Sequence, residues 1–312
     1  LFQYFPSTGQ MKQTEAFHNN SIKSLALDGN GYLLAGTDNG LYVYHNDVTP
    51  LQHIIHDSRN IQSLTNNIIW NIFADQEHNI WLGTDYGISL SRYNSALQFI
   101  PISQITGTGD GNQFYSLFRD SKGFYWFGGT NGLIRFTDPA GDKHNAIWYM
   151  GDKTYPLSHN RIRHIYEDKE QQLWIATDGS INRYDYATRQ FVHYNIVDST
   201  GTYNTNWTYY MFEDNAGRLW ISTCLGGIFV VDKHRLMQSA SGQYVAEQNY
   251  SVHNGLSGMF INQIIPDNEG NVWVLLYNNK GIDKINPRTR EVTKLFADEL
   301  NGEKSPNYLL CD

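Results

Sequence analysis

Residues 75–93 read DQEHNIWLGTDYGISLSRY. The stretch begins with an Asp and a short polar turn, and it continues with a Trp-centred apolar run that ends in Gly-Thr. A Gly-containing turn and a second apolar run follow. Asp and Asn hydrogen-bond to their own backbone, and Gly or Asn tolerates positive φ, so both polar segments have turn chemistry. The pattern predicts two short β-strands joined by a tight turn.

The same pattern occurs six times. Five copies carry Trp at the sixth position after the Asp, and a copy that begins at Asp28 carries Leu34 there instead; a seventh copy, 307–312, is cut off. The anchoring Asp residues stand at positions 28, 75, 120, 168, 214, 267 and 312, which are 47, 45, 48, 46, 53 and 45 residues apart. A period in the forties with several short strands per unit is typical of a β-propeller.

Each unit predicts a blade of four antiparallel strands, because residues 67–73 form a further β-rich run before the Asp and 97–100 or 190–194 form another after the second turn. We therefore expect an all-β, seven-bladed β-propeller that occupies 1–312 as a single domain. The expected repeats are 21–66, 67–111, 112–159, 160–205, 206–259 and 260–304, with a seventh blade split between 305–312 and 1–20. Because the chain starts within a strand and stops within a turn, we expect it to be an excerpt of a longer propeller array.

The repeated Trp residues are expected to pack between neighbouring blades, since an isolated four-stranded sheet would leave apolar faces in water. These structural residues are Trp81, Trp126, Trp174, Trp220 and Trp273.

Composition restricts the function. A net charge of −8 argues against general nucleic-acid binding, which needs a basic surface. The chain has two cysteines, Cys224 and Cys311, in no zinc or redox spacing, and it lacks phosphate-binding, dinucleotide-binding, metalloprotease and nucleophile-elbow motifs. We expect no cofactor, no metal, no catalytic residue and no membrane-spanning segment within these residues.

The unit N-x-I-x-x-I-x-x-D-x-x-G-x-[LI]-W-[IL]-G-T-x-x-G-[LI]-x-x-[YF] resembles the two-component regulator propeller repeat. The resemblance implies the periplasmic sensor of a hybrid two-component regulator, which binds an oligosaccharide, signals to a histidine kinase and controls glycan utilisation. It also implies a neighbouring propeller or immunoglobulin-like domain, a possible homodimer, and membrane attachment only through a segment outside this chain. The repeat consensus is structural, so it transfers no binding residues.

Alignment of the predicted first strands points to a binding face. The position five residues before each anchoring Asp holds aromatic or planar polar side chains in most units: Lys23, Trp70, Tyr115, Arg163, Tyr209, Asn262 and Asn307. The next position is also mostly polar or aromatic: Ser24, Asn71, Ser116, His164, Tyr210, Gln263 and Tyr308. Aromatic rings stack on the C–H faces of sugars, and planar polar groups bond their hydroxyls or carboxylates. These positions therefore predict a sugar-binding face at the mouth of the channel.

The candidate ligand-binding residues combine these positions with two aromatics in turns or loops and with an arginine two residues before Arg163: Trp70, Tyr86, Tyr115, Arg161, Arg163, His164, Trp207 and Tyr209. Two arginines at alternate positions of a strand, Arg161 and Arg163, could clamp an acidic sugar. The equally open alternative is that they pair with a local acid, Glu167, Asp168 or Asp178.

Two other function classes remain open from the sequence. A propeller-fold polysaccharide lyase or glycosidase could use His164, Tyr209 and Arg163 as base, acid and carboxylate neutraliser, although their spacing does not single them out. A hydrolase would need two carboxylates that face each other across the substrate, and the regular Asp is already explained by its turn. The third class is a protein-interaction scaffold.

Overall fold

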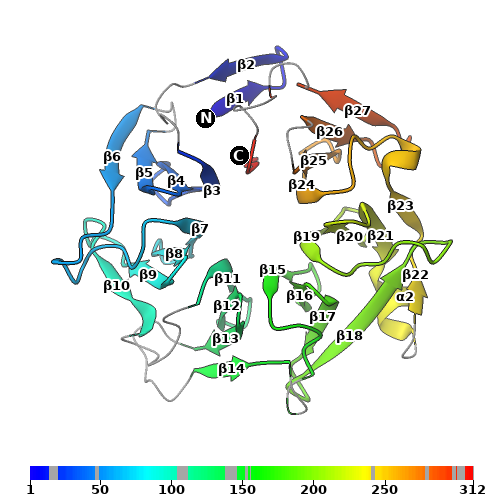
Figure 1. Cartoon of the computed structure of the whole chain (residues 1–312), viewed down its shortest axis with the longest axis horizontal. Helices are drawn as coiled ribbons and strands as arrows, with labels where there is room; N and C mark the ends of the chain where they lie inside the picture. Colours follow the sequence, from blue (N-terminus) through cyan, green and yellow to red (C-terminus); the bar gives the residue numbers. More distant parts are fainter. Residues whose placement is uncertain are drawn as a thin grey trace. The chain divides into compact units, whose positions relative to one another are not determined.

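The computed structural model describes residues 1–13, 20–45, 49–103, 112–137, 146–151, 154, 156–239, 243–277, 281–296, 300 and 306–311. The chain divides into two compact units, Leu1–Leu117 and Phe118–Asp312, and the boundary falls within strand β11. Figure 1 labels the elements of both units.

The first unit contains two four-stranded antiparallel sheets and a strand pair. One sheet has β3 (Ile22–Leu27), β4 (Leu33–Thr37), β5 (Gly40–Tyr44) and β6 (Pro50–Ile54) in chain order. The other has β7 (Ile69–Ala74), β8 (Ile80–Thr84), β9 (Gly87–Ser91) and β10 (Phe99–Pro101). The pair is β1 (Phe2–Phe5) with β2 (Gln10–Gln13).

The second unit continues the series. The sheet that begins with β11 (Phe114–Arg119) adds β12 (Tyr125–Gly129), β13 (Gly132–Phe136) and β14 (Ile147–Tyr149). The next is β15 (Ile162–Glu167), β16 (Leu173–Thr177), β17 (Ser180–Asp185) and β18 (Gln190–Val197). Then come β19 (Thr208–Glu213), β20 (Arg218–Thr223), β21 (Ile228–Asp232) and β23 (Gln248–Tyr250), and finally β24 (Ile261–Pro266), β25 (Val272–Leu276), β26 (Ile282–Ile285) and β27 (Val292–Leu295). The first strands lie side by side, β15 against β19 and β19 against β24.

The expected all-β propeller of four-stranded antiparallel blades is confirmed, but the described residues form six complete blades rather than seven. The pair β1–β2 supplies two strands only, and 306–311 form no strand. Side chains hold this last segment: Asn262 Nδ2 donates to the Asn307 carbonyl at 3.0 Å, and Gln263 exchanges two hydrogen bonds with the Leu309 backbone. We number the blades one to six from β3.

Blade five departs from the regular hairpin series between its third and fourth strands. A short helix, α2 (Lys233–Gln238), and the strand β22 (Gln243–Val245) are inserted there, and β22 pairs in parallel with β18 of blade four. The Lys233 ammonium is buried between Asp168 at 3.2 Å and Glu213 at 3.0 Å. This excursion therefore ties blade five to blade four.

The repeated Asp organises each turn. In blade four, Asp168 Oδ1 accepts the backbone N–H groups of Glu170 and Gln172, and its Oδ2 accepts the indole N–H of Trp174 at 2.9 Å. The other four Asp–Trp pairs have the same bond: Asp75–Trp81 at 2.8 Å, Asp120–Trp126 at 2.7 Å, Asp214–Trp220 at 2.8 Å and Asp267–Trp273 at 3.0 Å. The spacing of six residues is thus the spacing of a hydrogen bond between turn and strand.

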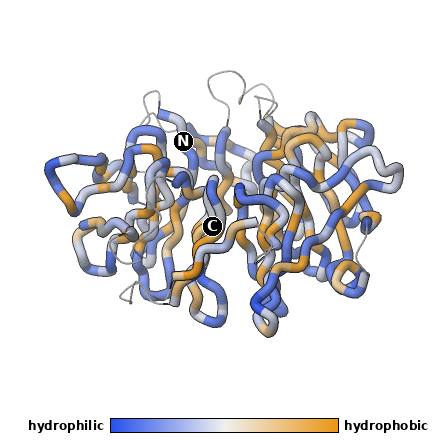
Figure 2. The backbone as a smooth tube through the Cα atoms, turned by 60° about the horizontal axis from the view of Figure 1, so that its bottom comes forward, coloured by the Kyte–Doolittle hydropathy of each residue, from blue (hydrophilic) through white to orange (hydrophobic). Residues whose placement is uncertain are grey.

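The indoles also fill the space between sheets of the second unit. Trp126 shares a buried cluster with Ile162 and Ile165 of blade four, and Trp174 shares one with Met211 of blade five. Figure 2 shows the hydrophobic stretches along the strands and the hydrophilic ones at the turns. Trp273 differs from the expectation of full burial: it is partly exposed and lies 5.1 Å from the Lys284 ammonium.

Removal of one Asp–Trp bond should destabilise the chain measurably. We expect Trp174→Phe to lower the free energy of unfolding by about 1 to 3 kcal/mol, because a buried carboxylate oxygen loses a donor. Trp174→Ala should cost about 3 to 5 kcal/mol, since it also leaves a cavity. Urea denaturation measures both values. The exposed Trp207 is the control: Trp207→Phe should cost less than about 0.5 kcal/mol, and equal costs at the two positions would contradict this role of the bond.

Candidate functional site

The position five residues before the anchoring Asp is a β-bulge. The register of the first strand shifts there in β3, β7, β15, β19 and β24, so that one residue lies outside the ladder. A bulge redirects a side chain and is frequent beside binding sites. The bulged residues are Lys23, Trp70, Arg163, Tyr209 and Asn262.

In the first unit the bulge side chains contact one another. The Lys23 ammonium lies 4.4 Å from the Trp70 ring centroid, and the Trp70 and Tyr115 rings meet edge to face at 5.6 Å. The Trp70 indole N–H donates to Asp85 Oδ1 at 3.0 Å. Tyr86, which follows Asp85 in the chain, is 55% exposed. The structure thus brings Trp70 and Tyr115 together, but the indole N–H already has a partner in the chain.

The two arginines of blade four share a counter-ion. Arg163 binds Asp178 through two hydrogen bonds, Nε to Oδ1 at 2.7 Å and Nη2 to Oδ2 at 3.2 Å. Arg161 Nη1 lies 3.7 Å from the same carboxylate. Of the three acids that the sequence left open, Asp178 is therefore the partner. The guanidinium of Arg163, which also covers the Tyr209 ring at 4.6 Å, is charge-compensated.

His164 connects two blades. Its ring stacks on Tyr210 at a centroid distance of 3.8 Å, and its Nδ1 accepts the Met211 backbone N–H at 3.4 Å. Asn71 and Gln263, at the same repeat position, accept backbone N–H groups in the same way. Burial lowers the pKa of His164 to about 3, so the ring is neutral at physiological pH. These contacts favour a structural role over that of a catalytic base.

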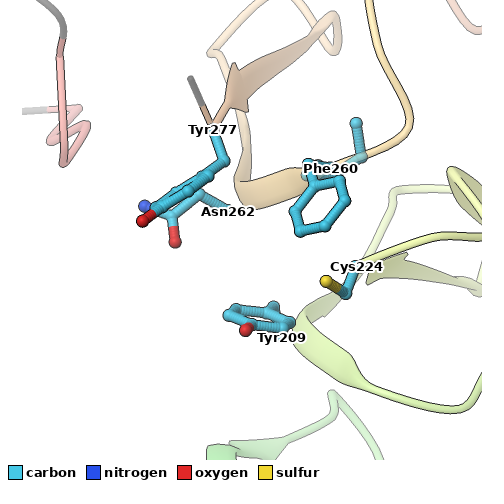
Figure 3. Close-up of a pocket in the computed structure, with 6 residues that line it drawn as sticks. Tyr209, Cys224, Phe260, Asn262 and Tyr277 are labelled. Atoms are coloured by element: carbon cyan, nitrogen blue, oxygen red, sulfur yellow. The ribbon is translucent and has the colours of Figure 1, made fainter. Parts of the chain in front are cut away.

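The second unit contains a hollow of about 220 Å³ at the blade five and blade six bulges, and we call it the aromatic hollow. It is lined by Tyr209, Cys224, Phe260, Ile261, Asn262 and Tyr277. Figure 3 shows the Tyr209 and Phe260 rings and the Cys224 thiol projecting toward one space, with Asn262 beside Tyr277. The Phe260 and Tyr277 rings are 6.1 Å apart and tilted by 33°. Among the residues that the structure describes, no Asp, Glu, Lys or Arg lines the hollow.

A departure from the repeat creates this hollow. The residue that follows the second strand is Asp85 in blade two and Asp178 in blade four, where it binds the bulge side chain. In blades five and six the same position holds Cys224 and Tyr277. The bulge residues there have no carboxylate from this position, and aromatic surface takes its place. Sequence reasoning selected Tyr209 and placed Asn262 at an aligned position of the predicted binding face, but it missed Cys224, Phe260 and Tyr277, although the lost Asp was visible as a break in the pattern.

Burial affects two ionisable groups of the hollow. Burial raises the pKa of the Cys224 thiol and of the Tyr209 hydroxyl above their ordinary values. Of the two cysteines, Cys224 is buried and Cys311 is exposed. An uncharged surface of rings, hydroxyls and one amide suits a polyhydroxylated ligand better than a charged one.

Trp207 lies between the arginine cluster and the aromatic hollow. Its backbone N–H donates to the Asp178 carbonyl at 3.0 Å, and its carbonyl accepts the Cys224 N–H at 3.0 Å. The residue has φ of 54°, and its side chain is 47% exposed. A bulky residue in the left-handed region is held there by its surroundings, as is frequent in binding sites.

Within the described ranges, no group of three or more His, Cys, Asp or Glu side chains is arranged to hold a metal ion. No helix of the same ranges is both long and apolar enough to cross a bilayer.

Three segments of the chain resemble a known family of repeats. The two component regulator propeller family matches residues 63–86, 108–131 and 156–179. The chain contains two-component regulator propeller repeats. Each matched segment covers the first strand, the Asp turn and the second strand of one blade.

Two solved structures and one further relative extend the comparison. The extracellular domain of the proposed hybrid two component system BT4673 from B. thetaiotaomicron is 94% identical, with a TM-score of 0.67, over 100% of this chain and 42% of that chain. The corresponding domain of BT3049 from the same organism is 22% identical over 96% of this chain and 37% of that chain; its TM-score of 0.70 supports the fold alone. Histidine kinase P4 from Formosa agariphila is 26% identical over 204 residues, 60% of this chain and 13% of that protein. The chain therefore spans less than half the length of each.

The neutral state of His164 predicts a pH dependence of stability. An unfolded His binds a proton near pH 6.5, whereas folded His164 binds one only near pH 3. The unfolded state thus holds more protons between these values, so stability should fall as the pH falls through this window. His164→Gln, which copies Gln263, should reduce that fall. Urea denaturation between pH 7 and pH 4 measures it, and an unchanged slope in the variant would contradict the assignment.

The arginine pairing predicts a gain of anion affinity on removal of Asp178. Asp178→Asn should leave Arg163 and Arg161 without their shared counter-ion, so the chain should bind a uronic acid oligosaccharide that the unmodified chain does not bind. This binding should weaken with added salt, because the gained attraction is electrostatic. Calorimetry at two salt concentrations tests it, with Asp85→Asn as the matched control. Strong uronate binding by the unmodified chain would show that Asp178 does not compensate the arginines.

Proposed function

We propose that this chain is part of the extracytoplasmic, periplasmic sensor of a hybrid two-component regulator, and that its aromatic hollow binds an uncharged oligosaccharide. Binding would be reported to a histidine kinase across the inner membrane, through segments outside this chain, to control glycan utilisation. A neighbouring propeller or immunoglobulin-like domain and a second protomer are the expected signalling partners.

The sensor assignment is supported by the repeats and by the relatives. The regulator propeller repeats occur in this chain, and the 94% identical domain is named as the extracellular part of a hybrid two component system. A relative named as a histidine kinase is far longer than the matched region. A kinase elsewhere in the same protein is consistent with both observations.

The ligand class rests on one observation: aromatic rings and an amide converge where the repeat has lost its carboxylate. Tyr209, Phe260 and Tyr277 offer ring faces, and Asn262 offers its side-chain carbonyl oxygen, since its Nδ2 already donates to the Asn307 carbonyl. Tyr277 is 57% exposed and Trp207 is 47% exposed, so an extended ligand can reach from the hollow to Trp207. An oligosaccharide has the alternating apolar faces and hydroxyls that such a surface recognises.

The acidic-sugar clamp anticipated from the sequence is replaced by this proposal. Arg163 donates two hydrogen bonds to the Asp178 carboxylate, one from Nε and one from Nη2. Neither Arg163 nor Arg161 lines the hollow. A charged ligand would therefore meet an already compensated pair. A neutral saccharide needs no counter-ion, and it fits the uncharged lining.

The same lining argues for binding without cleavage. Hydrolysis of a glycosidic bond needs two carboxyl groups that flank the bond, and none of the described residues that line the hollow carries one. The candidate base His164 is committed to Tyr210 and Met211. We therefore expect the saccharide to leave the protein chemically intact.

Calorimetry against neutral and uronic acid oligosaccharides, with chromatography of the same mixtures, tests the proposal. We expect a neutral oligosaccharide to bind, and Tyr277→Ala to weaken it about tenfold, which is about 1.4 kcal/mol. Tyr86→Ala is the matched control, because Tyr86 lies in the turn after the second strand of blade two, has a similar exposure and lies in the other unit. It should leave the affinity unchanged.

Three results would oppose the proposal. Released smaller sugars would support the lyase or glycosidase class instead. A loss of affinity in Tyr86→Ala but not in Tyr277→Ala would move the site to the first unit, near Trp70 and Tyr115. A failure of all saccharides to bind would favour the scaffold class.

A further inference from the structure

Three blades anchor the segment that leads into their first strand by the same device. The residue ten positions before the turn Asp bonds a side chain of the third strand. In blade two the Thr65 N–H donates to Ser89 Oγ at 2.9 Å. In blade four the Ser158 N–H donates to Asn182 Oδ1 at 3.0 Å, and Asn182 Nδ2 donates to Ser158 Oγ at 2.8 Å. Both third-strand residues are neutral.

Blade six uses a carboxylate in this place. The Ser257 N–H donates to Asp283 Oδ2 and the Ser257 hydroxyl donates to Asp283 Oδ1, each at 2.7 Å. In blades two and four a second hydroxyl, from Thr84 or Thr177, also bonds the anchored residue. Leu276 stands at that position in blade six, so Asp283 receives both bonds of Ser257.

A carboxylate at this position carries a free-energy cost of burial. Asp283 is fully buried, with 0% exposure, and burial raises its pKa. Its neighbour across the ladder on β27 is Lys294, and its neighbour on β25 is the apolar Val274. A buried charge costs free energy that the neutral Ser89 and Asn182 do not cost. Such a local departure is expected where a site needs it.

The anchored segment leads directly into the aromatic hollow. Ser257 precedes Phe260, Ile261 and Asn262 by three to five residues, and all three line the hollow. The Phe260 carbonyl in turn accepts the Tyr277 N–H at 2.9 Å. A shift of Ser257 would therefore move Phe260 and Asn262. It would also disturb the backbone hydrogen bond that joins Phe260 to Tyr277.

We propose that Asp283 is a positioning residue for the aromatic hollow, because its two bonds to Ser257 fix the segment that carries Phe260 and Asn262 into it. Asp283 does not line the hollow and acts through Ser257. The inference deepens the proposed function, and its saccharide-binding consequence rests on that function.

Cys224 provides a test that needs no saccharide. Its thiol is buried beside Phe260 and Tyr209, so its rate of alkylation by iodoacetamide reports how closed the hollow is. A Cys311→Ser background removes the exposed second thiol. In this background we expect Asp283→Ala to raise the alkylation rate of Cys224 at least about tenfold, and Asp283→Asn to leave it within about twofold, because Asn182 already makes both bonds in blade four.

Ser89→Ala is the matched control, since it removes the same kind of anchor in the first unit. It should lower the melting temperature without changing the Cys224 rate. An equal Cys224 rate in the unmodified chain and Asp283→Ala would overturn the proposal. A rise in Ser89→Ala as large as in Asp283→Ala would overturn it too, because general destabilisation would then explain both.

The saccharide that binds tightest in the calorimetric panel supplies a second readout. Its affinity should fall about tenfold in Asp283→Ala and recover in Asp283→Asn. If no saccharide binds the unmodified chain, the proposed function fails, while the alkylation rates still decide the role of Asp283. If a saccharide binds and Asp283→Ala binds it equally well, the positioning role fails and the proposed function stands.

Discussion

One carboxylate in each blade sets the geometry on which the rest depends. The turn Asp accepts two backbone N–H groups through one oxygen and, in five blades, an indole N–H through the other, as Asp168 does with Glu170, Gln172 and Trp174. The turn therefore fixes where the second strand starts, and the indole fixes how that strand faces its neighbour. In blade one Asp28 keeps the backbone bonds while Leu34 replaces the indole. The turn bonds alone are thus enough to form a blade, and the indole adds packing.

Side chains between blades repeat as regularly as the turns. Asn71, His164 and Gln263 stand at one repeat position. Asn71 and His164 each accept a backbone N–H from the next first strand, and Gln263 accepts the Leu309 N–H of the segment 306–311. Glu167 and Glu213, which precede the turn Asp, each accept the N–H that follows the Asp of the previous blade. Polar residues on inner strands are therefore largely committed to the fold. This commitment removes His164 from the set of plausible catalytic groups.

The candidate site lies where this regularity breaks. The bulge directs one side chain of the first strand out of the ladder in every blade whose register is described, but in blades two and four an Asp from the second strand binds it. Cys224 and Tyr277 replace that Asp, so Tyr209 and Asn262 face a hollow instead of a carboxylate. Asp283 shows the complementary change, since a charge enters where other blades use Ser or Asn. The repeated contacts thus hold the scaffold, and the exceptions to them line the aromatic hollow.

The sequence by itself determined the repeat, the four-stranded blade and the regulator propeller resemblance, because turn chemistry and strand periodicity are local properties that recur at a constant spacing. It also placed Tyr209 and Trp207 among the candidates. The replacement of Asp by Cys224 and Tyr277 was visible in it as a break in the repeat. Only the tertiary structure decided that Asp178 neutralises Arg163, that His164 is a connector, and that residues 306–311 are held by side chains without forming a strand. Those outcomes depend on which side chains meet across blades, and pairing between residues tens of positions apart is decided by the packed fold, not by local sequence.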